Sequence, residues 1–471
     1  MQGETAHRPP AYGRQMHEAG AWRRLTRWLG RLAGSSPARA ALLIFALTIG
    51  LFTSLLMMPW ATAGADSPEF HDALFVATSA VTVTGLTPVN TAEHWSLAGE
   101  IVILVGIQIG GLGIITIAAL LAISVTRHLG LRTRLVAQEG ISTGKLGETG
   151  SLIRTVVICS AVVELALALV LVPRMIVLEG DVGTGLWHGI FYAVSAFNNA
   201  GFVIHPEGLA GIGHDPLVLW TLMAGVFLGS LGFPVLLLLW RYRWHIRRWS
   251  LHTRLTVEVT VLLMVLGAVL YGILEWNHAD TLGGMSTGEK LQNSLFASVM
   301  MRSGGFSVVD NVMEHSETML ITNALMFAGG GSASTAGGIK VTTIAVIFLA
   351  FLAEARGHEE STAHGRTIPA QAVRVAISVV AMGATFVLVS TLALIIISGE
   401  DLERTLFESI SAFATCGLTS GLTEELPPSG LYVLSGLMFA GRIGIMTFAT
   451  ALTIRHTRTR YRYPEARPII G

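Results

Sequence analysis

The sequence predicts an all-α integral membrane protein built from four repeats, each with a span, a short re-entrant helix and its loop, and a second span. Three observations support this class. Of the 471 residues, 52% are hydrophobic and only 13% are charged, whereas soluble domains carry about 25% charged residues. Eight apolar runs are long enough to cross a bilayer, and one short motif recurs four times between them.

Eight transmembrane helices are predicted from these runs. A helix needs about 20 mostly apolar residues to cross a hydrocarbon core roughly 30 Å thick. Seven of the runs are expected to span simply. The eight runs are 40–60, 97–126, 155–178, 216–240, 255–274, 319–353, 375–398 and 431–454.

The run 319–353 is too long for one straight span, because its 35 residues would form a helix roughly 52 Å long. Clustered glycine is a poor helix former, so the Gly-rich segment 329–338 is expected to interrupt it. Non-helical backbone at membrane depth is tolerated only where protein or a water-filled cavity satisfies its polar groups. The interruption therefore indicates a pore nearby.

Basic residues set the expected orientation, since Lys and Arg accumulate in cytoplasmic segments. The outer segments hold only Lys290, Arg302 and Arg404. Both termini are therefore predicted to be cytoplasmic. Of the 31 basic residues, 25 lie in the segment up to Arg39 and in 127–154, 241–254, 352–374 and 455–467.

The predicted spans and loops divide the chain into six parts. Each repeat after the first begins with a cytoplasmic loop, and the third contains the Gly-rich segment. The parts are the N-terminal cytoplasmic segment 1–38, the repeats 39–126, 127–240, 241–353 and 354–454, and the cytoplasmic tail 455–471.

A recurring motif lies in each outer segment. It has a phenylalanine ten residues before a glycine, a serine six residues before it, and an apolar residue after it. The third copy keeps Gly305 but has Leu295 and Val299 in place of the phenylalanine and serine. The other three copies are Phe75, Ser79 and Gly85; Phe191, Ser195 and Gly201; and Phe407, Ser411 and Gly417.

The segments before these glycines, such as 68–80, are too short to span and fit re-entrant half-helices. Four of them around one axis direct their carbonyl ends, with partial negative charge, at the bilayer centre, which favours a cation. Glycine then allows backbone angles that turn carbonyls toward the axis, and rings of carbonyls underlie potassium selectivity. A single copy is more simply a tight turn, but four in matching register predict one central pore with a filter.

The candidate filter residues immediately precede and include the four glycines. K+ is the only metal ion expected, and no transition-metal site is expected. The residues are Thr82, Val83, Thr84 and Gly85; Asn198, Asn199, Ala200 and Gly201; Ser303, Gly304 and Gly305; and Ala414, Thr415, Cys416 and Gly417.

Seven strings carry a family resemblance. Residues 78–86, 196–202, 302–306 and 414–418 resemble the four pore loops of the Ktr/Trk/HKT potassium transporter superfamily. Its other signatures resemble 108–114, 334–343 and 441–444. The likeness runs from about residue 40 to 455. Trk-type subunits carry two additional N-terminal spans that residues 1–38 are not expected to supply, so the chain is more similar to Ktr membrane subunits of the KtrB type.

The resemblance implies a potassium-permeable pore with weak filter sites in a multi-pass protein of the bacterial inner membrane. It implies a homodimer and a cytosolic, nucleotide-binding regulatory ring of the KtrA kind. The nucleotide is expected on that partner, with no cofactor in this chain and no nucleic acid bound. Ser303-Gly304 departs mildly from the commoner Thr-Ala pattern of the third loop, which predicts altered flexibility there.

The resemblance also implies that the Gly-rich loop after Phe327 gates the pore beneath the filter. The candidate gate residues are Gly329, Gly330, Gly331, Ser332, Ala333, Ser334, Thr335, Ala336, Gly337, Gly338, Lys340 and Arg442.

Two of these gate residues are charged. Arg442 is the only charge in 431–454, and intramembrane charge is costly. It is interpreted as a positive barrier to cations, with a structural ion pair to an acidic neighbour as the alternative. Lys340 is interpreted as repelling K+ or anchoring the loop to a carboxylate, and snorkelling toward the cytoplasmic interface is its alternative.

Several alternative functional interpretations arise from the same sequence. Glu164 is interpreted as bonding a neighbouring helix, with an ion or proton site as the alternative. Ser332–Thr335 lacks the Gly-Lys-Ser/Thr pattern of a phosphate loop, so no nucleotide site is expected in this chain. An intramembrane enzyme would need facing catalytic groups inside its spans, and the predicted spans offer almost none, so no enzyme activity is expected. A Na+-permeable or Na+-coupled transporter remains an alternative. The resemblance implies that a serine at the first-loop position accompanies a preference for Na+, so Gly85 at that position favours K+. Activation by Na+ stays undetermined.

Overall fold

The computed structural model describes residues 37–64, 68–128, 149–242 and 245–444. Helices dominate this part of the chain, and its one sheet is a small hairpin of β1 (Thr362–Ala363) and β2 (Arg366–Thr367). The predicted all-α class is therefore confirmed for the described residues. Most of the predicted N-terminal segment and the whole predicted tail lie outside them.

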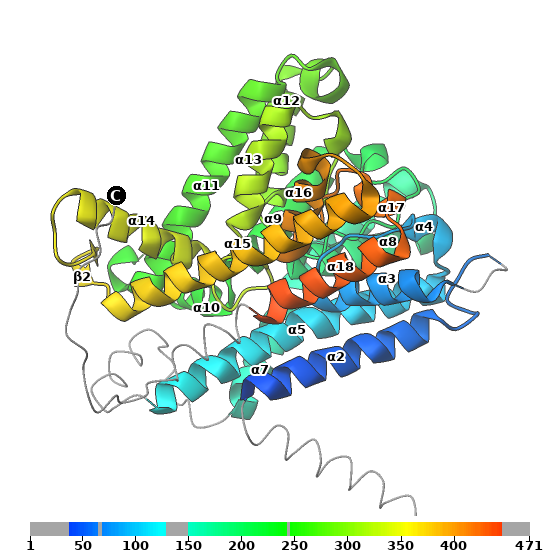
Figure 1. Cartoon of the computed structure of the whole chain (residues 1–471). Coiled ribbons are helices and arrows are strands. Elements are labelled where there is room, and N and C mark those ends of the chain that lie inside the picture. Colours follow the sequence, from blue (N-terminus) through cyan, green and yellow to red (C-terminus); the bar gives the residue numbers. More distant parts are fainter. Residues whose placement is uncertain (1–36, 65–67, 129–148, 243–244, 445–471) are drawn as a thin grey trace, which may run out of the picture.

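One order of elements occurs four times: a long helix, a short helix, a loop and another helix (Figure 1). The four sets are α2 (Pro37–Leu56), α3 (Phe70–Thr82) and α5 (Leu97–His128); α7 (Thr149–Glu179), α8 (Val182–Asn198) and α9 (Pro216–Leu231); α11 (Leu251–Glu275), α12 (Thr287–Met300) and α13 (Ser316–Phe327); and α15 (Ala370–Ser398), α16 (Leu402–Ala414) and α18 (Pro428–Phe439).

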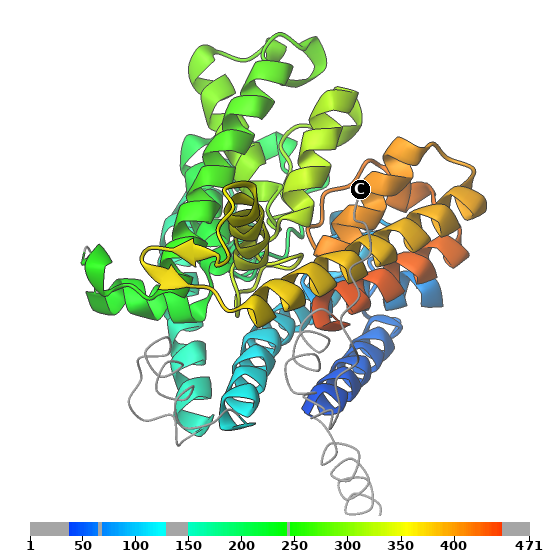
Figure 2. The ribbon, with the colours of Figure 1, turned by 60° about the vertical axis from the view of Figure 1, so that its left-hand side comes forward.

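The four sets pack in a closed cycle. The last helix of each set contacts the short helix of the next, so that α5 packs on α8, α9 on α12 and α13 on α16. The cycle closes because α18 packs on α3, and Figure 2 shows the red and blue ends of the described chain side by side. The four short helices therefore surround a common centre.

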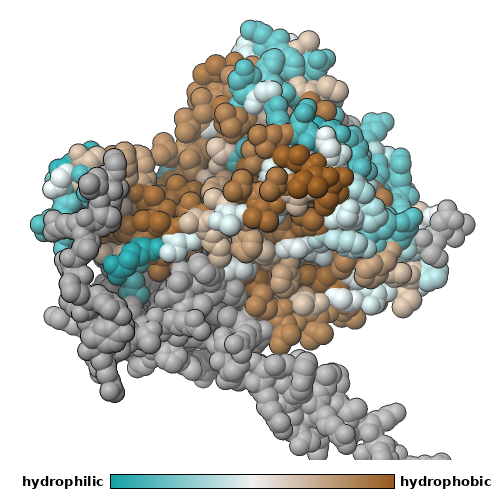
Figure 3. Space-filling view, viewed as in Figure 1, coloured by the Kyte–Doolittle hydropathy of each residue, from teal (hydrophilic) through white to brown (hydrophobic). Residues whose placement is uncertain are grey.

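Among the described residues, three helices are long and apolar enough to cross a membrane: residues 154–179 of α7, all of α11 and all of α15. Their outer faces expose large apolar side chains such as Leu169, Ile273 and Ile396, which is typical of lipid contact. Figure 3 shows apolar surface over much of α11 and α15 and polar surface at the upper end of the molecule. The layout of eight spans stays a prediction.

The expectation of a simple span over 216–240 is wrong. α9 ends at Leu231, and α10 (Phe233–Tyr242) continues at an angle of 101° to it. The bend is at Gly232, whose φ of 90° is open to glycine but strained for other residues. The Phe233 N–H then bonds the Ala333 carbonyl, 3.1 Å away. A contact from a distant loop therefore replaces a helical bond at the break.

The predicted interruption of the run 319–353 is confirmed. α13 ends at Phe327 and α14 (Val341–Ala355) begins after a non-helical stretch. We name residues 328–340 the central loop. Its two ends are held together by a parallel bridge between Ala328 and Ile339.

Candidate ion pathway

Four matching turns follow the short helices. In each, a residue other than glycine takes left-handed backbone angles, and a glycine with positive φ follows two residues later. Such angles are uncommon outside glycine, and backbone strain of this kind clusters at functional sites. The pairs are Val83 and Gly85 (φ 57° and 99°), Asn199 and Gly201 (59° and 69°), Ser303 and Gly305 (75° and 73°), and Thr415 and Gly417 (46° and 98°).

The four glycines converge on one point, and we name them the glycine ring. A Cβ atom added to Gly201 would lie 2.7 Å from the Gly305 Cα, and one on Gly305 would lie 3.3 Å from the Gly417 Cα. A Cβ on Gly417 would lie 3.2 Å from the Gly85 Cα, and one on Gly85 would collide with the Ala200 carbonyl. Each glycine thus approaches the next around the ring, where no side chain fits.

The serine of the motif holds the turn. The Ser79 hydroxyl accepts a hydrogen bond from the Gly85 N–H at 3.0 Å, and the Ser411 hydroxyl accepts one from the Gly417 N–H at 3.2 Å. In the second copy, Ser195 donates to the Phe202 carbonyl instead, at 3.3 Å. The sequence period therefore has a physical cause, since the serine bonds the chain at or just beyond the glycine.

The third turn is held differently because Val299 has no hydroxyl. The N–H groups of Gly304 and Gly305 both donate to the Met300 carbonyl, at 2.8 and 3.3 Å. Ser303 compensates from within the loop by donating to the Thr415 carbonyl of the fourth turn, 3.0 Å away. The third copy of the motif, which lacks the serine, is therefore also the copy whose turn has different backbone hydrogen bonds.

The remaining candidate filter residues are buried beside the glycine ring, although not all turn toward it. The Thr82 and Thr84 hydroxyls bond each other at 2.7 Å, and the Cys416 thiol donates to the Met301 carbonyl at 3.4 Å. The Asn198 amide bonds Gln108 on α5 at 2.9 Å and Glu164 on α7 at 3.2 Å. The Asn198 side chain therefore ties α8 to neighbouring helices and does not turn toward the glycine ring.

Glu164 takes part in a side-chain network among helices. Besides Asn198, it accepts hydrogen bonds from Gln108 at 3.0 Å and Ser160 at 2.7 Å. This is the bonding role favoured for it from the sequence.

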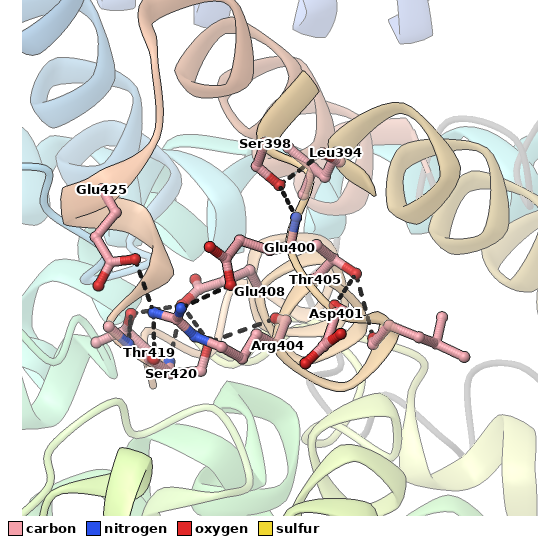
Figure 4. A network of polar contacts seen from close by, with 12 residues as sticks. Leu394, Ser398, Glu400, Asp401, Arg404, Thr405, Glu408, Thr419, Ser420 and Glu425 are labelled. Carbon is pink, nitrogen blue, oxygen red and sulfur yellow. Dashed lines mark hydrogen bonds and ion pairs between the residues drawn. The ribbon is translucent and has the colours of Figure 1, made fainter. Parts of the chain in front are cut away.

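The chain leaving the fourth turn is fixed to its own short helix (Figure 4). Glu408, fully buried on α16, accepts hydrogen bonds from the Thr419 hydroxyl at 2.5 Å and the Ser420 N–H at 2.8 Å. Arg404 extends the network by pairing with Glu400 at 2.9 Å and Glu425 at 3.1 Å. This exit segment is therefore rigidly anchored.

The central loop lies against the turns that carry the glycine ring. The Thr335 hydroxyl lies 2.8 Å from the Asn199 Oδ1 and 3.1 Å from the Phe197 carbonyl. The Gly337 N–H donates to the Ser303 hydroxyl at 2.8 Å, and the Gly331 N–H to the Ser230 carbonyl, also at 2.8 Å. The loop is therefore held by the second and third turns and by the end of α9.

Arg442 joins the central loop to the fourth turn. Its side chain is 2% exposed, and it donates to the Thr415 hydroxyl at 3.0 Å and to the Thr335 carbonyl. Within the described ranges no carboxylate pairs with it, so the alternative of an ion pair is wrong there. Lys340 donates to the Ala336 carbonyl at 2.8 Å, which turns its amine back into the loop instead of along α14.

Arg302 has a buried role that the charge pattern does not indicate. The charge count treats it as an outer basic residue, yet it is 4% exposed. Its guanidinium donates to the Thr260 carbonyl on α11 at 2.8 Å and to the Gly329 carbonyl at 3.1 Å. Arg302 therefore anchors the start of the central loop. Its position directly before Ser303 was the only sequence signal for this role.

Comparison with known proteins places this arrangement in a family. The profile of TrkH, cation transport protein, matches residues 39–462. Ktr system potassium uptake protein B of Bacillus subtilis (strain 168) is 36% identical over 436 residues, covering 93% of this chain and 97% of that protein. Its namesake in Vibrio alginolyticus is 35% identical, covering 89% of this chain and 92% of that protein.

Two further similarities extend the comparison. Potassium/sodium uptake protein NtpJ of Enterococcus hirae is 34% identical, covering 93% of this chain and 97% of that protein. The crystal structure of the potassium transporter TrkH from Vibrio parahaemolyticus matches with a TM-score of 0.66 at 19% identity, over 86% of this chain and 83% of that one. These relatives are transporters, which removes the intramembrane enzyme from consideration. The chain belongs to the TrkH family of cation transport proteins.

Proposed function

We propose that this chain is the translocating membrane subunit of a potassium uptake system, with K+ passing through the glycine ring. The observation that carries the proposal is the convergence of four glycine turns from four matching sets of helices. From this close approach of the four backbones we infer that carbonyls of all four turns face one ion. Such carbonyl rings can replace the hydration shell of K+.

The ends of the short helices support a cation site. Residues 83, 199 and 415 cap the C-termini of α3, α8 and α16, and each terminus carries roughly half an elementary negative charge. Two relatives named for potassium uptake are 36% and 35% identical to this chain over most of its length. The negative helix ends and the similarity to these relatives therefore both favour a monovalent cation such as K+.

The central loop is proposed as the gate, because it bonds the turns of the glycine ring directly. Thr335 reaches Asn199, Gly337 reaches Ser303, and Arg442 bridges Thr335 to Thr415. A loop rich in glycine can move between packed and withdrawn positions at low steric cost. Arg442 adds a buried positive charge that opposes cation passage through a poorly screened region.

The expected assembly follows from the relatives' names. Two of them are components of Ktr systems, so we propose that this chain also works with partner subunits. A homodimer bound to a cytosolic ring that senses a nucleotide is the form we expect. The setting is the bacterial inner membrane, with both termini cytoplasmic.

Na+ permeation or coupling is the second candidate. One relative is named a potassium/sodium uptake protein, and both ions are monovalent. Gly85 favours K+, since its turn leaves no space for a side chain. The K+ transporter and the Na+-permeable or Na+-coupled transporter differ in whether Na+ itself crosses the membrane or only activates K+ uptake.

Rubidium uptake into liposomes containing the purified chain tests the proposal. We expect uptake above that of empty liposomes, with K+ competing more strongly than Na+. Uptake measured with and without external Na+ then separates activation from competition. Equal competition by both ions would favour the Na+-permeable alternative, and uptake no greater than in empty liposomes would refute the proposal.

A further inference from the structure

Two histidines and a glutamate from three segments converge beside the second turn. Glu179 ends α7, His188 lies on α8, and His205 lies four residues beyond Gly201. The Glu179 Oε1 is 3.0 Å from the His188 Nδ1 and 2.6 Å from the His205 Nε2. All three ligand atoms lie within 4.8 Å of one another. Neither spacing in the sequence is a known metal motif, so only the fold brings them together.

The cluster is shielded and its geometry is supported from outside. The His188 and His205 side chains are 12% and 11% exposed, and that of Glu179 is 22% exposed. The Tyr192 hydroxyl is 2.5 Å from the His205 Nδ1 and also accepts the Ile204 N–H at 3.3 Å. Metal-binding histidines usually have their other ring nitrogen fixed by such a partner. His205 is therefore oriented with its Nε2 toward Glu179.

The chemistry of the three side chains suits metal binding. Each imidazole has a ring nitrogen whose lone pair can bind a metal, and the Glu179 carboxylate supplies a negative charge at the same point.

We propose that Glu179, His188 and His205 form a binding site for a divalent transition-metal cation, with Zn2+ as its best-fitting representative. Two imidazoles and a carboxylate are a common zinc ligand set, with bonds of about 2.0–2.2 Å and water as fourth ligand. Ligand atoms already gathered around one point need only small side-chain shifts to reach those distances. Mg2+ and Ca2+ prefer all-oxygen sites and should not compete.

A second cluster of the same residue types lacks these properties. In Glu275, His278 and His315, both carboxylate oxygens are already occupied. One accepts the Thr318 hydroxyl at 2.5 Å and the His315 N–H at 3.0 Å, and the other accepts the Thr281 hydroxyl at 2.7 Å. His315 is also exposed. This cluster instead joins the end of α11 to the N-terminus of α13, and it serves as a matched control.

A bound metal would connect three parts of the second repeat. It would join the end of α7 to α8 and to the segment that leaves Gly201. Those parts surround one quarter of the glycine ring, so the site is a means by which an external metal restrains the pore. The binding itself does not depend on which ion the pore carries.

The site is tested by isothermal titration calorimetry, in which Zn2+ is titrated into the full-length protein in lipid nanodiscs. We expect His188→Gln with His205→Gln to weaken Zn2+ binding at least ~10-fold, whereas His278→Gln with His315→Gln and the exposed His214→Gln leave it unchanged. Co2+ bound to the unaltered protein should give the visible absorption typical of tetrahedral sites, and excess Mg2+ should not displace it.

The outcomes are decisive in both directions. Unchanged Zn2+ affinity in the His188 and His205 double variant, or an equal loss in the His278 and His315 double variant, would overturn the assignment. If the first double variant fails to elute as a folded protein, Tyr192→Phe replaces it. That change keeps all three ligands and removes the hydroxyl that partners the His205 Nδ1 and accepts the Ile204 N–H, so we expect ~10-fold weaker binding. Full affinity there would also count against the site.

Discussion

Replacing Thr335 by valine removes the hydroxyl that holds the central loop to the second turn. Valine has nearly the same shape, so packing is retained while the contacts to Asn199 and Phe197, at 2.8 and 3.1 Å, are lost. A hydroxyl donates only one proton, so the two contacts count as about one hydrogen bond, and burial leaves their acceptors unsatisfied. The cost to the packed loop is about 1–3 kcal/mol.

That cost translates into a measurable flux. If the packed loop is the closed state, a loss of about 1–3 kcal/mol shifts its equilibrium by roughly 5- to 150-fold toward the open state. We therefore expect initial rubidium uptake at rest to rise about 5-fold or more. The K+ to Na+ competition ratio should change little, since the Asn199 backbone is held separately by its N–H bond to the Ala196 carbonyl.

The assay compares liposomes containing equal amounts of each protein. Thr391→Val is the matched control, because Thr391 is also buried but its hydroxyl has no partner and lies on α15. Higher uptake in Thr335→Val but not in Thr391→Val supports the gate. Unchanged or lower uptake in a folded Thr335→Val protein would show that the loop supports the fold and does not close the pathway.

Three further predictions concern the ring, the charge and the outer loop. The Gly305→Ala change places a Cβ 2.5 Å from the Cys416 carbonyl oxygen. We expect it to weaken the discrimination of rubidium against Na+ in competition assays. The control Gly284→Ala adds a Cβ in open space and should leave that discrimination unchanged. The Arg442→Ala change should raise resting rubidium uptake several-fold, because it removes both a buried positive charge and a bond to Thr415. The Arg442→Lys change keeps the charge and should raise uptake less. Equal uptake in the unaltered protein and the alanine variant would contradict this prediction. Burial, helped by the neighbouring Glu275 and Asp310, raises the pKa of Glu314 from 4.5 to about 8. Between pH 4.5 and about 8, the folded state therefore holds a proton that the unfolded chain has lost. The stability that this shift contributes is fully present below pH 4.5 and is lost as the pH rises to about 8. Glu314→Gln should flatten that dependence in melting temperatures measured from pH 5 to 9, and an unchanged slope would exclude Glu314 as its source.

The local features of the site were predictable from the sequence. The fourfold period of glycine reflects a backbone requirement, because each turn approaches the next too closely for a Cβ. The serine six residues earlier reflects one hydrogen bond of fixed reach. The Gly-rich interruption was predictable because helix length and glycine content are local properties. Whether these residues form a selective filter stays a prediction.

The long-range features were not predictable. The break at Gly232 depends on a bond from Phe233 to Ala333, about a hundred positions away in the chain, and hydropathy across 216–240 gives no sign of it. Arg302 counts as one basic residue among few in the outer segments, whereas its burial depends on carbonyls of Thr260 and Gly329. Both partners are backbone groups, which a search for charged pairs cannot find.

The contacts of the central loop also change how the gate and the glycine ring relate. From the sequence, the four short helices are expected to surround the axis of the filter, and the Gly-rich loop is expected to lie beneath it. In the structure, three of the four left-handed residues that precede the ring carry polar side chains, and all three bond the loop or its anchor. Asn199 meets Thr335, Ser303 meets Gly337, and Thr415 meets Arg442.

Ser303 makes the connection most direct, because one hydroxyl accepts the Gly337 N–H and donates to the Thr415 carbonyl. Withdrawal of the loop removes the first bond and leaves the second, so the third turn loses a restraint on the side facing the loop. That turn is also the one without a motif serine, since Val299 stands in its place. Movement of the loop should therefore be felt first at Gly305, and a change in gating that alters ion preference would do so through the third turn.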